Sequence, residues 1–172
     1  MIAYLSNEAT MADVQVWVAV CQPGGVEVCS DRTYRFGVAP DALWDAIGTV
    51  EQFESWWPWL RSFDGEALAE GQVWSCVVQP PLPYVLRFGV ALEEVIEPRL
   101  VRVTVAGDIV GSATLEIAPI DGASEVRLRS ALSPSNGLLR VVAAVAWPVV
   151  RYGHDWVLDT GARQFRRRAL LT

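Results

Sequence analysis

The sequence contains a single histidine, His154, and only three cysteines, and neither residue type recurs at a metal-binding spacing. It also contains no glycine-rich phosphate loop, no paired-histidine motif and no Gly-x-Ser-x-Gly nucleophile elbow. With one histidine and no Cys-x-x-Cys pair, we expect no catalytic zinc or iron site, no other metal site and no cofactor. We expect Cys21, Cys29 and Cys76 to be reduced, because a Cys21–Cys29 disulfide would need a shifted register in the hairpin around Gly24-Gly25.

Long hydrophobic runs and excess positive charge are also missing. No run of about 18 apolar, uncharged residues is present, and the start of the chain has no basic segment before an apolar core. We therefore expect a soluble, cytoplasmic protein that does not insert into membranes. A net charge of −6 argues against a nucleic-acid partner. The arginines at 163 and 166–168 are explained as cations near a helix C-terminus, with a phosphate site as the alternative.

Apolar residues are abundant: they make up 52% of 172 residues, enough for one domain with a sizeable core. The longest periodic stretch covers residues 136–170. Its apolar side chains recur at three- and four-residue steps and form one helical stripe: Leu139, Ala143, Trp147, Val150, His154, Leu158, Gly161, Phe165 and Ala169. Pro148 should bend this helix into two segments that share an apolar face, and we expect the first segment to be the more buried one.

Strand-like runs separated by turn signals precede this helix. A first strand is expected over residues 32–38, followed by a short helix that Pro40 opens and a second short helix over residues 50–55. Six further runs cover residues 66–69, 72–79, 84–96, 100–106, 109–118 and 125–132. Because short connections favour the pairing of neighbouring strands, the pattern predicts an α+β fold: a curved seven-stranded antiparallel sheet with two short helices and a long C-terminal helix.

The segment APDALWDAI at residues 39–47, leading to Trp56-Trp57-Pro58-Trp59, resembles the START-like (SRPBCC) helix-grip superfamily, in particular its polyketide cyclase/dehydrase-type members. Residues 107–119 (GDIVGSATLEIAP) are similar to the sixth strand of those proteins, and residues 152–161 (YGHDWVLDTG) to the terminal helix of bacterial members. The resemblance covers about residues 31–170. We therefore divide the chain into an N-terminal extension, residues 1–30, which forms a hairpin or is partly disordered, and a helix-grip domain, residues 31–172.

The resemblance implies an apolar cavity between the sheet and the long helix. The superfamily includes lipid carriers, hormone receptors, aromatase/cyclases and oxygenase subunits, so it indicates a class of ligand rather than a reaction. The candidate ligand-binding residues are large apolar side chains together with the histidine: Trp56, Trp57, Trp59, Trp74, Leu86, Phe88, Val90, Leu115, Val150, His154 and Leu158. The three tryptophans that follow the short helices either line the cavity mouth or pack those helices against the sheet.

The polar candidates are few. His154 is the only side chain whose ordinary pKa suits proton transfer near neutral pH. It is a core histidine bonded to a backbone carbonyl or a strand side chain, a ligand contact, or a catalytic group, and Tyr84 is the second catalytic candidate. Four strand arginines are expected to point outward, unless one turns inward to bind a carboxylate or phenolate: Arg87, Arg102, Arg127 and Arg129.

The sequence therefore predicts a protein that binds a small, mostly apolar ligand, such as a lipid, a polyketide or an aromatic compound. The alternative is a cofactor-independent cyclase or dehydratase that acts on such a ligand, and a weaker alternative is an interaction module that uses exposed tryptophans. We expect a monomer or a weak homodimer, because the edge strand of the sheet is not visibly blocked.

Overall fold

The computed structural model describes residues 27–135 and 137–170. Seven strands in these residues form one antiparallel sheet in the order β1-β7-β6-β5-β4-β3-β2. The strands are β1 (Val28–Phe36), β2 (Leu60–Asp64), β3 (Val73–Val78), β4 (Leu86–Ile96), β5 (Leu100–Gly107), β6 (Ile109–Ile120) and β7 (Ala123–Pro134). The helices are α2 (Pro40–Gly48), the 3₁₀ turn η1 (Val50–Gln52), α3 (Phe53–Trp56), α4 (Gly137–Val145) and α5 (Trp147–Arg168). The predicted α+β, seven-stranded antiparallel architecture is confirmed.

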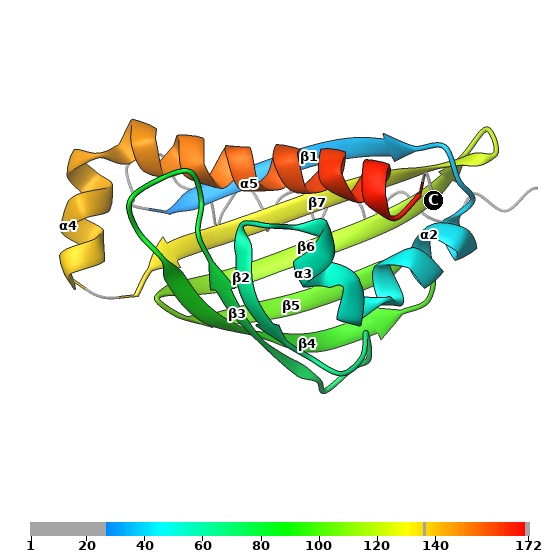
Figure 1. The fold of residues 1–172 in the computed structure, drawn as a ribbon, viewed down its shortest axis with the longest axis horizontal. Coiled ribbons are helices and arrows are strands. Elements are labelled where there is room, and N and C mark those ends of the chain that lie inside the picture. Colours follow the sequence, from blue (N-terminus) through cyan, green and yellow to red (C-terminus); the bar gives the residue numbers. More distant parts are fainter. Residues whose placement is uncertain (1–26, 136, 171–172) are drawn as a thin grey trace, which may run out of the picture.

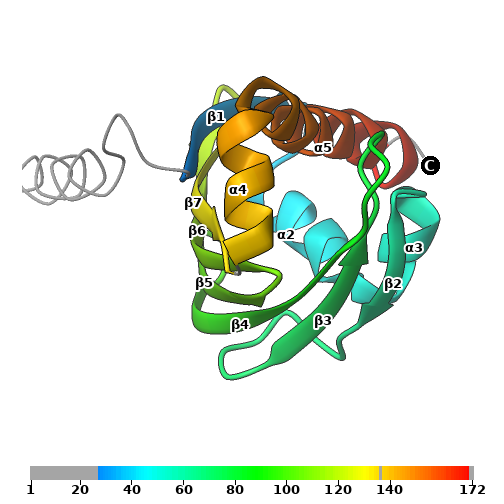
Figure 2. The same ribbon diagram turned by 90° about the vertical axis from the view of Figure 1, so that its left-hand side faces the viewer.

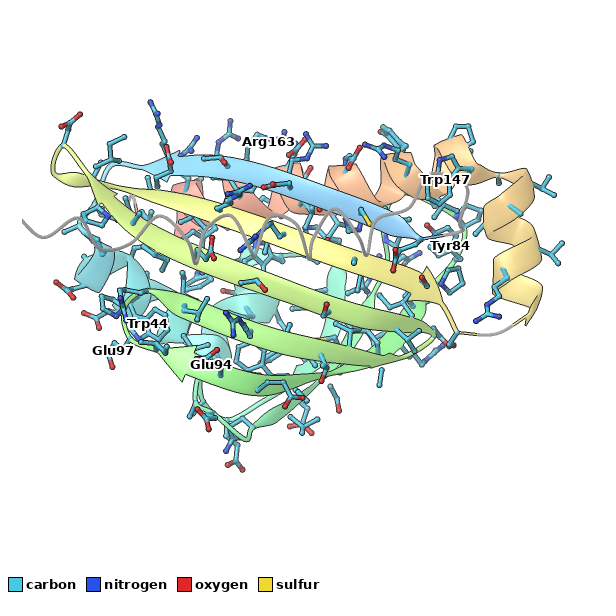
Figure 3. The ribbon with its side chains drawn as sticks, turned by 180° about the vertical axis from the view of Figure 1, so that it is seen from behind. Trp44, Tyr84, Glu94, Glu97, Trp147 and Arg163 are labelled. Atoms are coloured by element: carbon cyan, nitrogen blue, oxygen red, sulfur yellow. The ribbon has the colours of Figure 1, made fainter. Side chains whose placement is uncertain are left out.

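The sheet is strongly curled, and α5 lies across its concave side (Figures 1 and 2). Alternation along the strands sends one set of side chains to this side and the other set to the outer face. On β7 the concave set includes Leu128 and Leu132, as the sequence pattern predicts. The outer face carries charged pairs such as Arg102–Glu94, at 2.8 Å, and Figure 3 shows Glu94 on that face.

The two short helices are held by a cluster of aromatic rings. Pro40 stands in the first turn of α2, where a missing N–H costs nothing. Beyond α2, the Phe53 ring lies 4.9 Å from Trp57, 5.0 Å from Phe63 and 5.8 Å from Trp74, measured between ring centroids. This cluster joins α3 to β2 and β3, and it closes one end of the curled sheet.

The C-terminal helical region is broken, as predicted, but its first part is oriented differently from our expectation. The chain leaves the helical conformation at Ala146, and Pro148 stands in the first turn of α5. Figure 1 shows α4 turned sharply away from the axis of α5 at the far end of the molecule. The expectation that the first segment is the more buried one is wrong, since Val141 is 62% exposed and Val145 is 83% exposed.

One predicted strand is also wrong. Residues 66–69 form no strand, and the second strand of the sheet is instead β2, which pairs with β3 through Phe63 and Cys76. Residues 66–69 form a loop packed on Trp74, whose indole Nε1 donates a hydrogen bond to the Ala67 carbonyl at 3.0 Å. The first strand also begins earlier than predicted, at Val28 rather than Arg32, because Val28 to Phe36 pair continuously with β7.

The cysteines correct a further expectation. Cys29 is disulfide-bonded rather than reduced. Cys21, with which the sequence suggested a pairing in a shifted register, lies outside the described residues. Cys76 is a free, buried thiol on the concave face of β3, and burial raises its pKa to about 11. Within the described ranges, no helix is long and apolar enough to cross a bilayer.

Candidate functional site

Helix α5 is fixed along both of its sides. On the β1 side, Arg32 forms an ion pair with Asp155 at 3.0 Å, and the Tyr34 hydroxyl donates a hydrogen bond to Asp159 at 2.9 Å. On the other side, indole N–H groups from the segment after α3 donate to α5: Trp57 to the Gly161 carbonyl and Trp59 to Gln164, each at 3.0 Å. These contacts hold the helix in place across the hollow of the sheet.

A cavity of about 460 Å³ lies between the sheet and α5. Ten of the eleven predicted ligand-binding residues line it: Trp57, Trp59, Trp74, Leu86, Phe88, Val90, Leu115, Val150, His154 and Leu158. Trp56 does not line it. Its side chain is only 8% exposed and packs between Phe53 and Phe165, so it holds α3 against the end of α5.

The strand register explains why these residues meet. Trp74 on β3 lies opposite Val90 on β4, and Leu115 on β6 lies opposite both Val101 on β5 and Leu128 on β7. Residues paired in register point to the same face of a sheet, so the apolar members of these pairs pack side by side on the concave face. The same alternation indicates lining residues that the sequence analysis did not select: Val28, Val101, Val103, Ile109, Ala113, Leu128 and Leu132.

A second apolar chamber of about 230 Å³ adjoins the cavity near the small helices. The two spaces share wall residues that include Trp57, Leu115 and Leu158. The chamber is closed at its own end by Phe36 and Phe165, both of which are buried. The apolar space under α5 is thus longer than the main cavity alone.

His154 is the one titratable nitrogen base in the cavity wall. Its Nε2 lies 3.3 Å from the Ser30 hydroxyl and 3.4 Å from the Ser130 hydroxyl, and these two serines are 3.0 Å apart. Burial lowers the pKa of His154, and nearby Arg151 and Arg32 lower it further, whereas Asp155 acts in the opposite direction. The imidazole is therefore neutral near pH 7. The Nδ1 atom has no hydrogen-bond partner among the described residues.

Ser30 and Ser130 were not selected from the sequence. Ser130 had a recognisable signal, because it is the one polar residue in the concave set of β7 between Leu128 and Leu132. Ser30 follows from Ser130, since the two residues are paired across β1 and β7. Ser30 lies within the N-terminal extension predicted for residues 1–30, whereas in the structure it belongs to β1.

Tyr84 is the other polar group that the sequence singled out, and it also lines the cavity. Its hydroxyl has no hydrogen-bond partner in the described part of the chain, and burial raises its pKa. The side chain packs against α5 at Gly153: a Cβ placed there would lie 3.1 Å from the Tyr84 hydroxyl and 2.7 Å from Leu82. A glycine at this position allows the β3–β4 loop to rest directly on the helix.

None of the four candidate arginines lines the cavity. Arg129 is buried at 4% exposure, but it belongs to the outer set of β7 and forms an ion pair with Glu116 at 2.7 Å. Arg102 and Arg127 pair with Glu94 and Asp31. The alternative of an inward arginine that binds a ligand carboxylate inside the cavity is therefore wrong. Among the described residues, no three His, Cys, Asp or Glu side chains are grouped to hold a metal ion.

No family model matches the sequence, and no curated protein matches it either. Solved structures do match. A protein from Thermus thermophilus superposes with a TM-score of 0.70 at 14% identity, covering 84% of this chain and 97% of that one. A START superfamily protein from Mycobacterium smegmatis gives 0.62 at 15% identity, covering 84% and 99%. The chain has the START-like helix-grip fold.

This helix-grip fold is shared with an enzyme as well. The Zhui aromatase/cyclase from Streptomyces sp. R1128 superposes with a TM-score of 0.62 at 12% identity, covering 83% of this chain and 95% of that one. At such low identity the likeness shows the fold and not the activity. The function must therefore be argued from the cavity.

Proposed function

We propose that this helix-grip protein binds a small, mostly apolar molecule in the cavity between the sheet and α5. The observation that carries the proposal is the lining of the 460 Å³ cavity: apart from the Cys76 thiol and the tryptophans, its polar side chains are Tyr84, Ser133 and His154. An apolar cavity of this kind is poorly filled by water, so an apolar ligand gains free energy by entering it, about 0.8 kcal/mol for each buried methylene group.

The positions of the polar groups limit the ligand further. Among the described residues, neither the Nδ1 atom of His154 nor the hydroxyl of Tyr84 has a hydrogen-bond partner. A ligand that carries a hydroxyl or carbonyl group on an apolar body can form a hydrogen bond with one of these two groups. The rest of its surface then contacts the apolar side chains of the cavity wall. Lipids, polyketides and aromatic compounds are all of this kind. The START superfamily neighbour supports the proposal through its fold.

Binding is tested with N-phenyl-1-naphthylamine, an apolar probe whose fluorescence rises in a dry site. The wild type is compared with Ala113→Leu, which puts a larger side chain into the cavity from β6, and with Ala118→Leu, which makes the same change on the exposed face of that strand. We expect the wild type and Ala118→Leu to bind equally, and Ala113→Leu to bind about tenfold more weakly. No binding by the wild type, or equal binding by all three, contradicts the proposal.

A second candidate function is cyclase or dehydratase chemistry on a polyketide-like chain in the same cavity. It is favoured by one specific observation, namely that the neutral His154 imidazole and the Tyr84 hydroxyl both lie in the cavity wall. The cavity would fold the chain into a reactive conformation, and these two groups would move protons. This function predicts that the wild type converts a polyketide-like substrate. It also predicts that His154→Ala or Tyr84→Phe abolishes the conversion although the variant still binds the naphthylamine probe. If the wild type binds the substrate but does not convert it, ligand binding alone is the function.

The interaction-module alternative is not supported by the three tryptophans that follow the small helices. Trp56 is buried, and Trp57 and Trp59 are half-buried with their indole N–H groups bonded to α5. We keep the prediction of a monomer or weak homodimer, which a measurement of mass in solution tests.

A further inference from the structure

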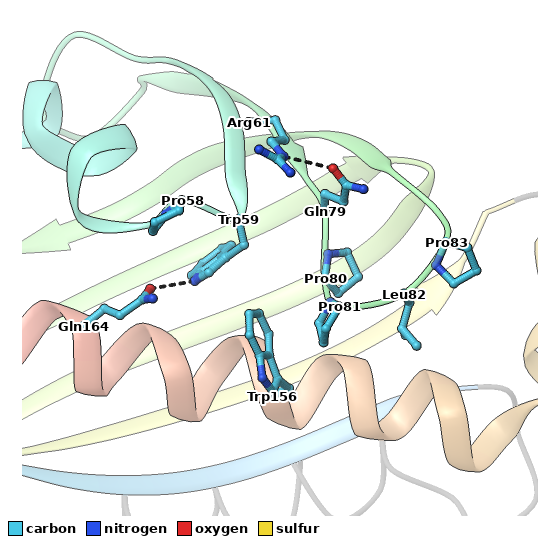
Figure 4. A pocket seen from close by; sticks show the side chains of 10 residues that line it. All are labelled: Pro58, Trp59, Arg61, Gln79, Pro80, Pro81, Leu82, Pro83, Trp156 and Gln164. Atoms are coloured by element: carbon cyan, nitrogen blue, oxygen red, sulfur yellow. Dashed lines mark hydrogen bonds between the residues drawn. The ribbon is translucent and has the colours of Figure 1, made fainter.

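A third space, a pocket of about 530 Å³, opens on the surface beside the cavity (Figure 4). We call it the outer pocket. It lies between α5, the start of β2 and the proline-rich loop at residues 80–83, and its polar wall is formed by Trp59, Arg61, Gln79, Trp156 and Gln164. Trp59 and Pro80 line both the outer pocket and the cavity. The two spaces are therefore adjacent, and an elongated molecule that passed Trp59 would extend from one into the other.

The two glutamine oxygens of the outer pocket each already accept one hydrogen bond from a neighbouring side chain. The Gln79 side-chain oxygen accepts a hydrogen bond from Arg61 Nε at 2.9 Å, and the Gln164 side-chain oxygen accepts one from Trp59 Nε1 at 3.0 Å (Figure 4). These bonds turn the NH₂ group of each glutamine away from its partner. The side-chain groups without a bond in the described part of the chain are donors: the two glutamine NH₂ groups, the terminal nitrogens of Arg61 and the indole N–H of Trp156. Donors therefore outnumber the second lone pairs of the two glutamine oxygens.

The charge of the outer pocket, like its hydrogen-bond donors, favours a ligand group that accepts hydrogen bonds. Arg61 has no acidic partner among the described residues, whereas Arg32, Arg102 and Arg129 each form an ion pair. No acidic side chain lines the outer pocket, as far as the structure describes the chain, although the whole chain has a net charge of −6. A cation beside several donors, with no carboxylate in the wall, is suited to a group that only accepts hydrogen bonds and carries negative charge.

We propose that the outer pocket binds the anionic head group of an amphipathic ligand whose apolar body lies in the cavity. The ligand class is thus an apolar chain or ring system that ends in a carboxylate or a comparable oxyanion, rather than a wholly neutral lipid. The inference rests on the proposed function, because it assigns the head group of the molecule that the cavity holds. The neighbouring prolines and Trp156 supply an apolar rim beside the exposed Arg61.

The test uses two probes with the same tail, dodecanoate and dodecanol, each displacing N-phenyl-1-naphthylamine below its micelle-forming concentration. Arg61→Gln removes the charge and keeps a donor. Arg99→Gln is the matched control, because Arg99 is also exposed, has no acidic partner in the described part of the chain and lies on the turn between β4 and β5. The full chain is used throughout.

We expect Arg61→Gln to weaken dodecanoate binding about fivefold and to leave dodecanol binding unchanged, with Arg99→Gln equal to the wild type for both. Added salt should weaken only dodecanoate. The head-group assignment is overturned if both probes bind and Arg61→Gln has the same affinities as the wild type. It is also overturned if Arg61→Gln lowers the affinity for both probes equally. In either case the proposal that the cavity binds an apolar ligand still stands. If neither probe binds and the naphthylamine does not bind either, the proposed function itself fails.

Discussion

Replacing Phe165 by alanine should be among the most damaging single changes in α5. The ring is 6% exposed and makes edge-to-face contacts with Phe36, at 5.7 Å, and Trp56, at 5.4 Å between centroids. It therefore joins β1, α3 and α5 at one point. A Phe→Ala change at such a site costs about 3–5 kcal/mol, through lost burial and the space left behind. The free energy of unfolding of a domain is about 5–15 kcal/mol, so a large fraction of it should disappear.

Urea unfolding followed by tryptophan fluorescence and by circular dichroism measures this loss. Phe165→Leu should lose clearly less, because it keeps most of the buried volume. Val145→Ala, at a side chain that is 83% exposed on α4, should stay within about 0.5 kcal/mol of the wild type. A loss below about 1 kcal/mol for Phe165→Ala would refute the reasoning, since the C-terminal half of α5 would then not be clamped against the small helices.

The cavity and the contacts of α5 support three more predictions. Ala113→Leu should raise the free energy of unfolding by about 0.5–2 kcal/mol by filling empty space, whereas Ala118→Leu should not; equal midpoints in urea would contradict the presence of a void. Burial lowers the pKa of His154, so the unfolded chain takes up the proton first as the pH falls, and stability should decrease through the ordinary histidine range and level off below the folded-state pKa. His154→Gln, which removes the only histidine, should abolish this component, and an unchanged pH profile would count against it. Trp57→Phe removes the donor to the Gly161 carbonyl and should cost about 1 kcal/mol in urea unfolding; a neutral effect would show that this bond does not fix α5.

The sheet could be predicted because its signals are local. Alternation along residues 125–132 fixes which side chains of β7 face inward, and short turns make neighbouring strands pair. The segment over residues 66–69 misled the prediction because Gly71 supplies a turn signal, whereas the true strand, β2, is short and lies directly after the tryptophans. What decided between the two was a long-range contact, the pairing of β2 with β3, which no local pattern contains.

The candidate site was predictable to the same extent and for the same reason. Residues such as Phe88, Val90 and Leu115 follow from strand alternation once the helix is known to lie on that face. The orientation of Trp56 does not, because three neighbouring tryptophans on a proline-bent segment point in directions set by their partners on α5 and α3. The donors and acceptors of the outer pocket also come from elements far apart in the sequence, so only the folded chain reveals them.

The most direct test of the central point is a crystal structure of the protein derivatised with xenon, which enters dry apolar cavities. We expect xenon between the sheet and α5, in contact with Leu115, Phe88 and Leu158, without displacement of the helix. A structure with no xenon there, and with side chains closed across the space between β6 and α5, would contradict it.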